Sequence, residues 1–250
     1  MLIAVDDAAD PRLADYVDLR HTPDRPAVIV EGITALTQVP GSGFPLRSVL
    51  CLSRHEPRVR AIVGADATVF IASDDVLRET VGFNLHRGIV AAVERPPAPS
   101  TDHILEGARV IAVLERLNDV ENLGALFRNA RAFGVDAVLL DPETADPLNR
   151  RTVRVSLGHV LRVPFARLDT WPPSLPGFRV VALTPAGDVD LHDVPPGPRT
   201  ALLLGSEGEG LTEQVTAKAD VRARIPMTDG VDSLNVATAG AIAFHHLSRR

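Results

Sequence analysis

The stretch ARVIAVLERLNDVENLGALFRNARAFGVDAVLLD, residues 108–141, alternates apolar runs with a periodic segment, and it decides the fold class. The apolar run at residues 108–115 predicts a strand, and residues 136–141 predict a second strand. Between them, residues 121–134 carry apolar side chains at helical spacing, and Gly134 is suited to end that helix. A strand, a helix and another strand in this order indicate an α/β fold with a parallel sheet.

The same alternation continues toward the C-terminus, so we expect one α/β domain over residues 108–250. Residues 148–160 are expected to be helical in part. Further strands are predicted at residues 178–184, 200–205 and 221–227, and helices at 212–219 and 232–250. Ligands of parallel sheets bind outside the carboxyl ends of the strands. We therefore look for the chemistry in three loops, at residues 115–124, 204–211 and 225–235.

Toward the N-terminus, the proline-rich stretch ERPPAPSTDHILEGA interrupts the pattern, and we place a linker at residues 96–107. Residues 23–95 alternate strands with short helices, which predicts a small second α/β domain. Strands are expected at residues 27–30, 46–53 and 87–95, one or two more within 60–73, and a capped helix at 73–82. Residues 1–22 form an N-terminal extension without an assignment.

Composition narrows the function classes. Cys51 is the only cysteine, and His245 and His246 are adjacent instead of four apart, so we expect neither a disulfide nor a metal site. No run of about 18 apolar residues predicts a membrane span, and no signal peptide is expected, which favours the cytoplasm. The net charge of −6 argues mildly against a broad nucleic-acid surface. Lys218 is the only lysine, however, so nearly all positive charge is arginine, whose planar fork suits phosphates and base edges.

The first loop offers Asn122 and Arg128. Asn122 stands where a helix N-cap is expected, and Arg128 lies off the apolar stripe of the helix that follows. The alternative to a functional role is that Asn122 only caps the helix and Arg128 is a solvated surface arginine.

The second loop, GSEGEGL at residues 205–211, is rich in glycine and acidic residues. Its G-x-x-G-x-G spacing differs from the dinucleotide fingerprint, and no G-K-[ST] follows, so a nucleotide polyphosphate is a poor candidate. Glycines permit close approach of the backbone to a ligand, and Glu207 is able to bind a cation. The alternative is a helix-entry turn whose glutamates favour the helix dipole, and for Glu209 this is the sole explanation.

The third loop lies before the closing helix. Pro226 ends a strand, Gly230 allows an unusual backbone angle, and Ser233 is expected to cap the helix, with Asn235 in its first turn. The alternative is ordinary capping without a further role.

Together, the three loops resemble the signature motifs of the SpoU (TrmH-like) family of RNA 2′-O-ribose methyltransferases, within the SPOUT superfamily. In chain order, the matched patterns are N-x-G-x-x-x-R (Asn122, Gly124, Arg128), L-G-x-E-x-x-G (Leu204, Gly205, Glu207, Gly210) and I-P-M followed by S-L-N-V (225–227 and 233–236). The chain departs from the family in Val120-Glu121 before the asparagine and in Ala237-Thr238 after S-L-N-V. Residues 23–95 resemble the L30e-like substrate-binding domain of many family members.

The resemblance implies a C-terminal domain with a deep trefoil knot, a rare exception to the rule that chains avoid knots. It also implies S-adenosylmethionine as the cofactor and a homodimer, formed through the C-terminal domain, whose active sites draw on both subunits. The residues expected at the cofactor are Leu204, Gly205, Gly210, Ile225, Met227, Gly230 and Leu234.

For catalysis, the resemblance assigns the action on the ribose 2′-hydroxyl to Arg128. Since a free guanidinium stays protonated, either Arg128 or an RNA phosphate takes the proton. Asn122 would orient Arg128, Glu207 would pair with or position it, and Ser233 and Asn235 would hydrogen-bond substrate or the cofactor loop. Ribosomal RNA is the first expectation for the substrate and transfer RNA the second. One alternative is an RNA-binding protein of this fold without catalysis. The other is an ordinary Rossmann methyltransferase, which is disfavoured because the chain lacks an early glycine-rich turn between a strand and a helix.

Overall fold

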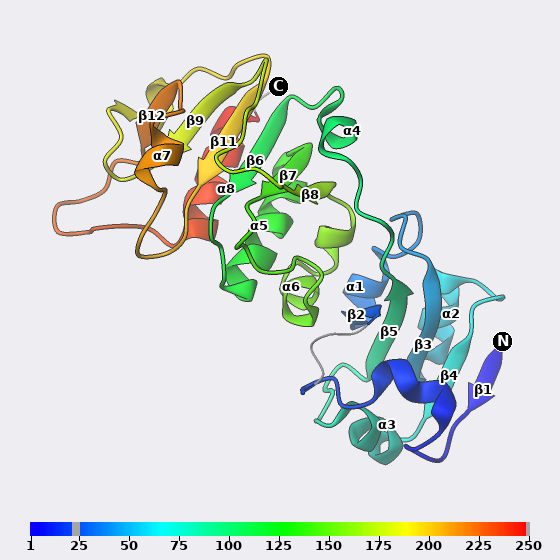
Figure 1. The fold of residues 1–250 in the computed structure, drawn as a ribbon. Coiled ribbons are helices and arrows are strands. Elements are labelled where there is room, and N and C mark those ends of the chain that lie inside the picture. The colour runs from blue at the N-terminus through cyan, green and yellow to red at the C-terminus, as the bar shows by residue number, and fades with distance from the viewer. Residues whose placement is uncertain (22–25, 249–250) are drawn as a thin grey trace. The chain divides into compact units, whose positions relative to one another are not determined.

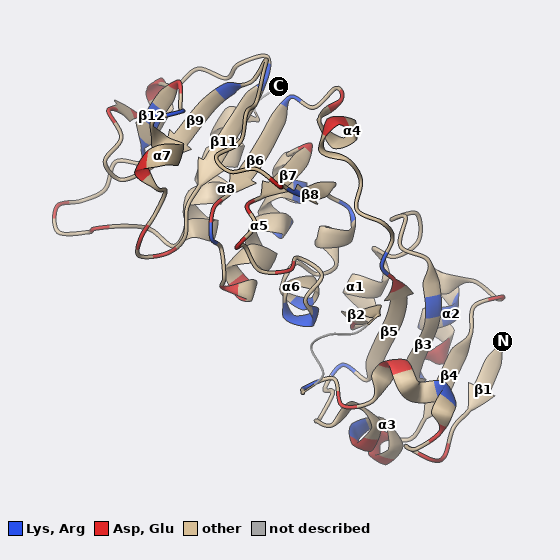
Figure 2. Cartoon of the chain, viewed as in Figure 1, with Lys and Arg blue, Asp and Glu red and all other residues tan. Residues whose placement is uncertain are grey.

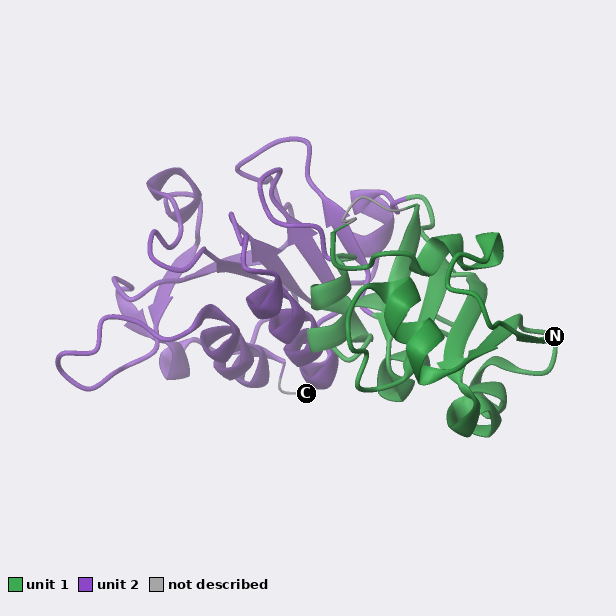
Figure 3. Ribbon diagram, turned by 90° about the horizontal axis from the view of Figure 1, so that it is seen from below, with its two compact units in different colours: residues 1–97, 148–162 green, residues 98–147, 163–250 purple. Residues whose placement is uncertain are grey.

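The computed structural model describes residues 1–21 and 26–248. The chain divides into two compact units (Figure 3). Unit 1 consists of Met1–Pro97 and Leu148–Arg162, and unit 2 of Ala98–Pro147 and Val163–Arg250. The boundary between Pro97 and Ala98 falls within the expected linker.

Unit 2 is built on one parallel sheet with the strand order β10-β12-β9-β11-β6-β7-β8 (Figure 1). Its strands are β6 (Val110–Leu114), β7 (Ala137–Leu140), β8 (Phe165–Arg167), β9 (Arg179–Leu183), β10 (Val189–Asp190), β11 (Thr200–Leu204) and β12 (Val221–Arg224). The central strands β6 and β11 are buried at every position, as expected for a sheet covered on both faces. The parallel sheet of an α/β fold is therefore confirmed, whereas the sequence pattern missed the short strands β8 and β10.

Different elements cover the two faces of this sheet. The helices of unit 2 are α4 (Thr101–Leu105), α5 (Val120–Phe133), α7 (Glu213–Thr216) and α8 (Val236–Leu247), with a 3-10 turn at Leu191–Asp193. Ile104 of α4, Val215 of α7 and Phe178 share one core with Ile111 and Leu203 of the sheet. On the other face, α5 and α8 pack side by side. None of the helices in the described part of the chain is long and apolar enough to cross a bilayer.

Unit 1 contains a mixed sheet with the order β1-β4-β3-β5-β2. Its strands are β1 (Leu2–Ala4), β2 (Ala27–Glu31), β3 (Leu46–Leu52), β4 (Val69–Ala72) and β5 (Ile89–Glu94), and its helices include α1 (Ile33–Leu36), α2 (Glu56–Val63) and α3 (Asp74–Val81). Strand β5 runs antiparallel to both β2 and β3, whereas β4 is parallel to β3 and β1. Residues 60–73 hold one strand, since Arg60–Val63 complete α2, which starts with Pro57 near its N-terminus.

The first 21 residues belong to unit 1 and contribute Val5, Leu13, Tyr16 and Leu19 to its core. Strand β1 extends its sheet, and the 3-10 helix Pro11–Tyr16 buries Leu13 and Tyr16 completely. The Tyr16 hydroxyl lies 2.6 Å from Ser48 Oγ, and burial raises the pKa of Tyr16. The boundary expected between residues 22 and 23 lies outside the described residues, as do the last two residues of the helix expected at 232–250.

Residues 148–162 also cluster with unit 1, although the sequence boundaries place them in the C-terminal domain. They contain α6 (Arg150–Val155) and a 3-10 turn at His159–Leu161. Arg150 forms an ion pair with buried Glu31 and lies 4.9 Å from the ring centroid of Phe83. Basic residues gather on α6, which is coloured largely blue in Figure 2, and one of them, Arg150, anchors the segment.

Candidate active site

A cavity of about 620 Å³ lies at the carboxyl ends of β9, β11 and β12. Because these strands are parallel neighbours in the sheet, the segments that follow them meet at one edge. The lining residues come from three segments: Leu183–Pro185 after β9, Leu204–Leu211 after β11, and Ile225, Met227, Asp232–Val236 and Ala239 after β12. Two of the loops chosen from the sequence therefore form the walls, and the turn after β9 is a wall that the sequence did not indicate.

Six of the seven residues expected at the cofactor line this cavity. The exception is Gly230, which is exposed and has a φ of 85°. Its left-handed backbone explains the glycine without any ligand. The role of the other six in binding a cofactor stays a prediction that their position supports.

The loop 205–211 closes on itself. Ser206 and Gly210 form an isolated antiparallel bridge, and Gly210 N donates to Ser206 O over 3.0 Å. A Cβ on Gly205 would lie 2.2 Å from the carbonyl carbon of Gly210, so only glycine fits there. The glycine pattern predicts close approach of the backbone to a ligand, and the structure adds that the loop's own backbone requires Gly205.

Asn235 joins the three motifs. Its Nδ2 donates to Asn122 Oδ1 over 2.8 Å and to Glu207 Oε1 over 2.7 Å. Its Oδ1 accepts from the backbone N–H groups of Ala237 and Thr238 at the start of α8. Both ends of the Asn235 amide are thus in use, which fixes the orientation of the side chain.

Two predicted helix caps are wrong. Asp119, not Asn122, caps α5, with Oδ1 accepting from the N–H groups of Glu121 and Asn122 over 2.7 and 3.0 Å. Asn235, not Ser233, caps α8. In consequence, Asn122 lies in the first turn of α5 with its side chain free to meet Asn235, and Ser233 lines the cavity as an exposed loop residue.

Arg128 lies on α5 with an exposed side chain. Within residues 1–21 and 26–248 it forms no ion pair, and the expected pairing of Glu207 with Arg128 is absent from this single chain. Glu207 instead accepts from Asn235. A positively charged side chain without a partner in its own chain is available to another molecule.

Glu209 has a partner that the sequence did not suggest. Its Oε2 lies 2.9 Å from Nη1 of Arg116, which follows β6 and has a φ of 53°. The neighbouring Glu115 is buried, and its carboxylate is hydrogen-bonded to Thr212 at the end of the loop. In the sequence, Glu115 and Arg116 stand out as two charged residues directly after a buried strand. That position was the available sign that they make contacts within the fold.

The lining of the cavity is acidic. It includes Glu207, Glu209 and Asp232, and none of the described residues lining it is lysine, arginine or histidine. Apolar side chains such as Leu204, Ile225 and Leu234 supply much of the remaining surface. This combination disfavours a phosphate-bearing ligand and suits a partly apolar ligand with a positive charge.

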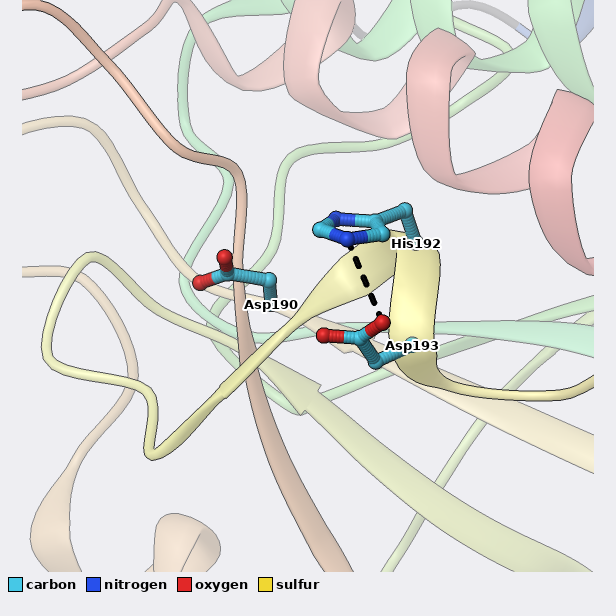
Figure 4. Close-up of side chains that lie close together, drawn as sticks. All are labelled: Asp190, His192 and Asp193. Carbon is cyan, nitrogen blue, oxygen red and sulfur yellow. Dashed lines mark ion pairs between the residues drawn. The ribbon is translucent and has the colours of Figure 1, made fainter.

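One group of potential metal ligands lies elsewhere in unit 2. Asp190, His192 and Asp193 place one ligand atom each within 4.8 Å of one another (Figure 4). Arg224 Nε already lies 2.7 Å from Asp190 Oδ1, while the His192 and Asp193 side chains are well exposed. A guanidinium at that oxygen competes with a cation, so the group is an ion-pair cluster, and the expectation of no metal site stays a prediction.

Comparison with known proteins places this architecture and site in a family. The SpoU rRNA Methylase family model matches residues 109–245, which is more than half of the chain. The chain is 44% identical to an uncharacterized tRNA/rRNA methyltransferase of Mycobacterium bovis, over 97% of this chain and 90% of the relative. The chain belongs to the SpoU family of RNA methyltransferases, and the family prediction made from the three motifs is confirmed.

Two further relatives are similar along almost their entire length. The 23S rRNA (guanosine(2553)-2′-O)-methyltransferase RlmP of Bacillus subtilis is 25% identical, over 97% of this chain and 98% of the relative. The crystal structure of an AdoMet-bound rRNA methyltransferase from Sinorhizobium meliloti superposes with a TM-score of 0.81 at 26% identity, covering 98% of this chain and 97% of that one.

Proposed function

We propose that this protein transfers a methyl group from S-adenosylmethionine to a ribose 2′-hydroxyl of structured RNA, with ribosomal RNA as the first candidate and transfer RNA as the second. The observation that carries the proposal is the junction of Asn122, Glu207 and Asn235 beside an acidic, partly apolar cavity. The full-length similarity to a 23S rRNA 2′-O-methyltransferase supports the ribose and ribosomal RNA.

The cavity fits S-adenosylmethionine chemically. The cofactor carries a positive sulfonium and no phosphate, which agrees with carboxylates and no cationic side chain among the described lining residues. Its volume of about 620 Å³ is ordinary for a small-molecule site. Leu204, Ile225 and Leu234 would contact the adenosine, and the backbone around Gly205 would form its hydrogen bonds. The AdoMet-bound neighbour supports this choice.

When bound, S-adenosylmethionine supplies an electrophilic methyl group, and the chain's residues must prepare the nucleophile. The ribose hydroxyl is a weak nucleophile, so its proton must be removed or its developing charge stabilised. Arg128 would align the hydroxyl and stabilise the oxygen, while Arg128 or a neighbouring RNA phosphate takes the proton. Asn235 holds Asn122 and Glu207 in place, so both present fixed polar groups to the substrate.

The active form would be a homodimer formed through unit 2, with Arg128 of one subunit serving the cavity of the other. The exposed Arg128 and its lack of an ion pair within the described chain support this arrangement. We further propose that unit 2 carries the deep trefoil knot of the superfamily and that unit 1 is an L30e-like RNA-binding domain. We also propose that no metal takes part. The same proposal has the enzyme act in the cytoplasm.

A basic segment on unit 1 would offset the acidic net charge. Residues 148–162 contain four arginines and no acidic residue. Arg150 pairs with Glu31, and Arg162 donates to the carbonyls of Pro40 and Gly41. Arg151 and Arg154 form no ion pair within the described chain, so they are available for RNA phosphates.

The test of catalysis is Arg128→Ala, assayed with radiolabelled S-adenosylmethionine and a substrate RNA. That RNA is first identified by mapping ribose methylation in total RNA from cells with and without the gene. We expect methyl transfer to fall roughly a hundredfold or more, with an unchanged fold. The matched control is Arg131→Ala, another exposed arginine of α5, which we expect to be active. Full activity of a folded Arg128→Ala dimer contradicts the assignment, and cofactor binding without methylation of any RNA favours a binding protein.

A further inference from the structure

Glu115 carries a buried carboxylate close to the loop that lines the cavity. Glu115 directly follows β6 and is 2% exposed. Its Oε2 accepts from Thr212 N over 2.8 Å, and its Oε1 accepts from Thr212 Oγ1 over 2.8 Å and from Trp171 Nε1 over 2.9 Å. A buried carboxylate is stable only when it is hydrogen-bonded in this way.

These contacts hold both ends of one loop. The backbone N–H of Glu115 donates to Leu204 O over 2.9 Å, immediately before the loop 205–211. The carboxylate binds Thr212, immediately after it. Arg116 adds a third contact, to Glu209 within the loop. Every residue from Gly205 to Leu211 lines the cavity, so the position of this loop sets the shape of one wall.

We propose that Glu115 is a positioning residue, which acts through Thr212 to hold the loop 205–211 in the conformation that binds S-adenosylmethionine. The inference deepens the proposed function, on which its ligand rests. Glu115 itself does not line the cavity. Its hydrogen bonds to charged oxygen are stronger than neutral ones, and their loss leaves the partly buried Thr212 N–H without an acceptor.

The hydrogen-bond pattern supplies a selective set of variants. Glu115→Met keeps the length of the side chain and removes both acceptors. Glu115→Gln is able to keep both contacts to Thr212, because its oxygen accepts from Thr212 N while its amide donates to Thr212 Oγ1. Its NH2 then faces the Trp171 Nε1–H donor, so the variant also sets two donors against each other. Trp171→Phe removes the hydrogen bond from Trp171 to Glu115 and leaves the loop contacts intact, so it is the matched control. Thr212→Val removes one loop contact should Glu115→Met fail to fold. It also removes the acceptor of Val215 N at the start of α7, so for this variant only Kd and the exchange of residues 205–211 are compared.

Two measurements decide the inference: the Kd of S-adenosylmethionine by calorimetry, and amide hydrogen exchange of residues 205–216 without ligand. We expect Glu115→Met to raise Kd about tenfold and to accelerate exchange, with a smaller change in the same direction for Thr212→Val. Trp171→Phe should stay within about threefold of the wild type, and Glu115→Gln should lie between Trp171→Phe and Glu115→Met.

Wild-type Kd and exchange in both Glu115→Met and Thr212→Val overturn the inference. Equal losses in Trp171→Phe and Glu115→Met also overturn it, since they indicate general damage to the core. If the wild type does not bind S-adenosylmethionine, the proposed function fails, while the exchange of residues 205–216 still decides whether Glu115 holds the loop.

Discussion

The helices α5 and α8 start at the same site but use their caps differently. Asp119 caps α5 with a carboxylate that only accepts, and its Oδ1 bonds the first N–H groups of the helix. Asn235 caps α8 with its oxygen, and its amide donates to Asn122 and Glu207. The difference shows how one side chain serves two purposes. An asparagine cap stabilises a helix and leaves two donors for the site, whereas an aspartate cap only stabilises the helix.

The largest effect is expected from Asn235→Asp, which makes the second cap like the first. Aspartate caps as well as asparagine does, so the N-cap of α8 should be kept. Both donors are lost, however, and a carboxylate is placed 2.7 Å from Glu207 Oε1, where like charges repel. We expect kcat/KM for methyl transfer to fall roughly a hundredfold. The reciprocal Asp119→Asn should keep activity, and equal losses in the two variants would contradict the comparison.

The second prediction concerns the close packing of α5 against α8, which keeps the starts of the two helices together. A Cβ on Gly240 of α8 would lie 2.4 Å from Leu126 Cδ2 of α5 and 3.3 Å from Leu204 Cδ1. Gly240→Ala should therefore lower the free energy of unfolding by about 2 kcal/mol through overpacking, partly offset by helix propensity. Urea denaturation measures this, with Ile242→Ala, an exposed position of the same helix, as the control. A more stable Gly240→Ala would show that the helices have room to separate.

The third effect is the loss of the Asp119 cap, which only stabilises α5. Asp119→Ala removes the acceptor for two backbone N–H groups and should destabilise the protein by about 1 kcal/mol. In a chain of this size, that corresponds to a melting temperature lowered by roughly 2–4 °C. Differential scanning calorimetry tests the value, and Asp119→Ser should restore most of it. The rate of methyl transfer below the melting transition should stay near that of the wild type. A loss of activity as large as that of Asn235→Asp would contradict the view that Asp119 only stabilises its helix.

The smallest effect concerns a hydrogen bond between the helices. Asn129 Nδ2 of α5 donates to Ala237 O in the first turn of α8 over 2.9 Å. Asn129→Ala should lower the free energy of unfolding by about 0.5–1 kcal/mol, because Ala237 O loses a partner at a partly buried position. Chemical denaturation resolves this, and Arg131→Ala on the exposed side of α5 is the control. If Asn129→Ala also loosens the Asn235 contacts, the cofactor affinity will fall with it.

The strands and helices around the site followed from local sequence. The apolar runs that became β6, β7, β9 and β11 are long enough and apolar enough to require burial on both faces, and the helical period of residues 121–134 predicted α5. The residues that cap the helices could not be predicted from local sequence. Asp119 and Asn122, like Ser233 and Asn235, are pairs of residues that cap well, and the direction in which the chain enters the helix selects between them.

Contacts distant in the sequence were outside the reach of any local pattern. Residues 1–21 lacked a recognisable motif, yet Leu13 and Tyr16 are fully buried in unit 1. Residues 148–162 lie between two strands of unit 2 in the sequence, yet the pairing of Arg150 with Glu31 ties them to unit 1. Glu209 had no explanation beyond the helix dipole until the structure brought Arg116 to it.

The sequence by itself determined the family, the parallel sheet and the segments that form the cavity, because spacing and apolar runs record which residues are buried and which loops lie at strand ends. Only the tertiary structure decided that Asn235 joins Asn122 to Glu207, that the loop's own backbone requires Gly205, and that Glu115 binds Thr212. The physical reason is that hydrogen bonds have strict limits of distance and direction, and these are met only after the sheet has placed separate segments within a few ångströms.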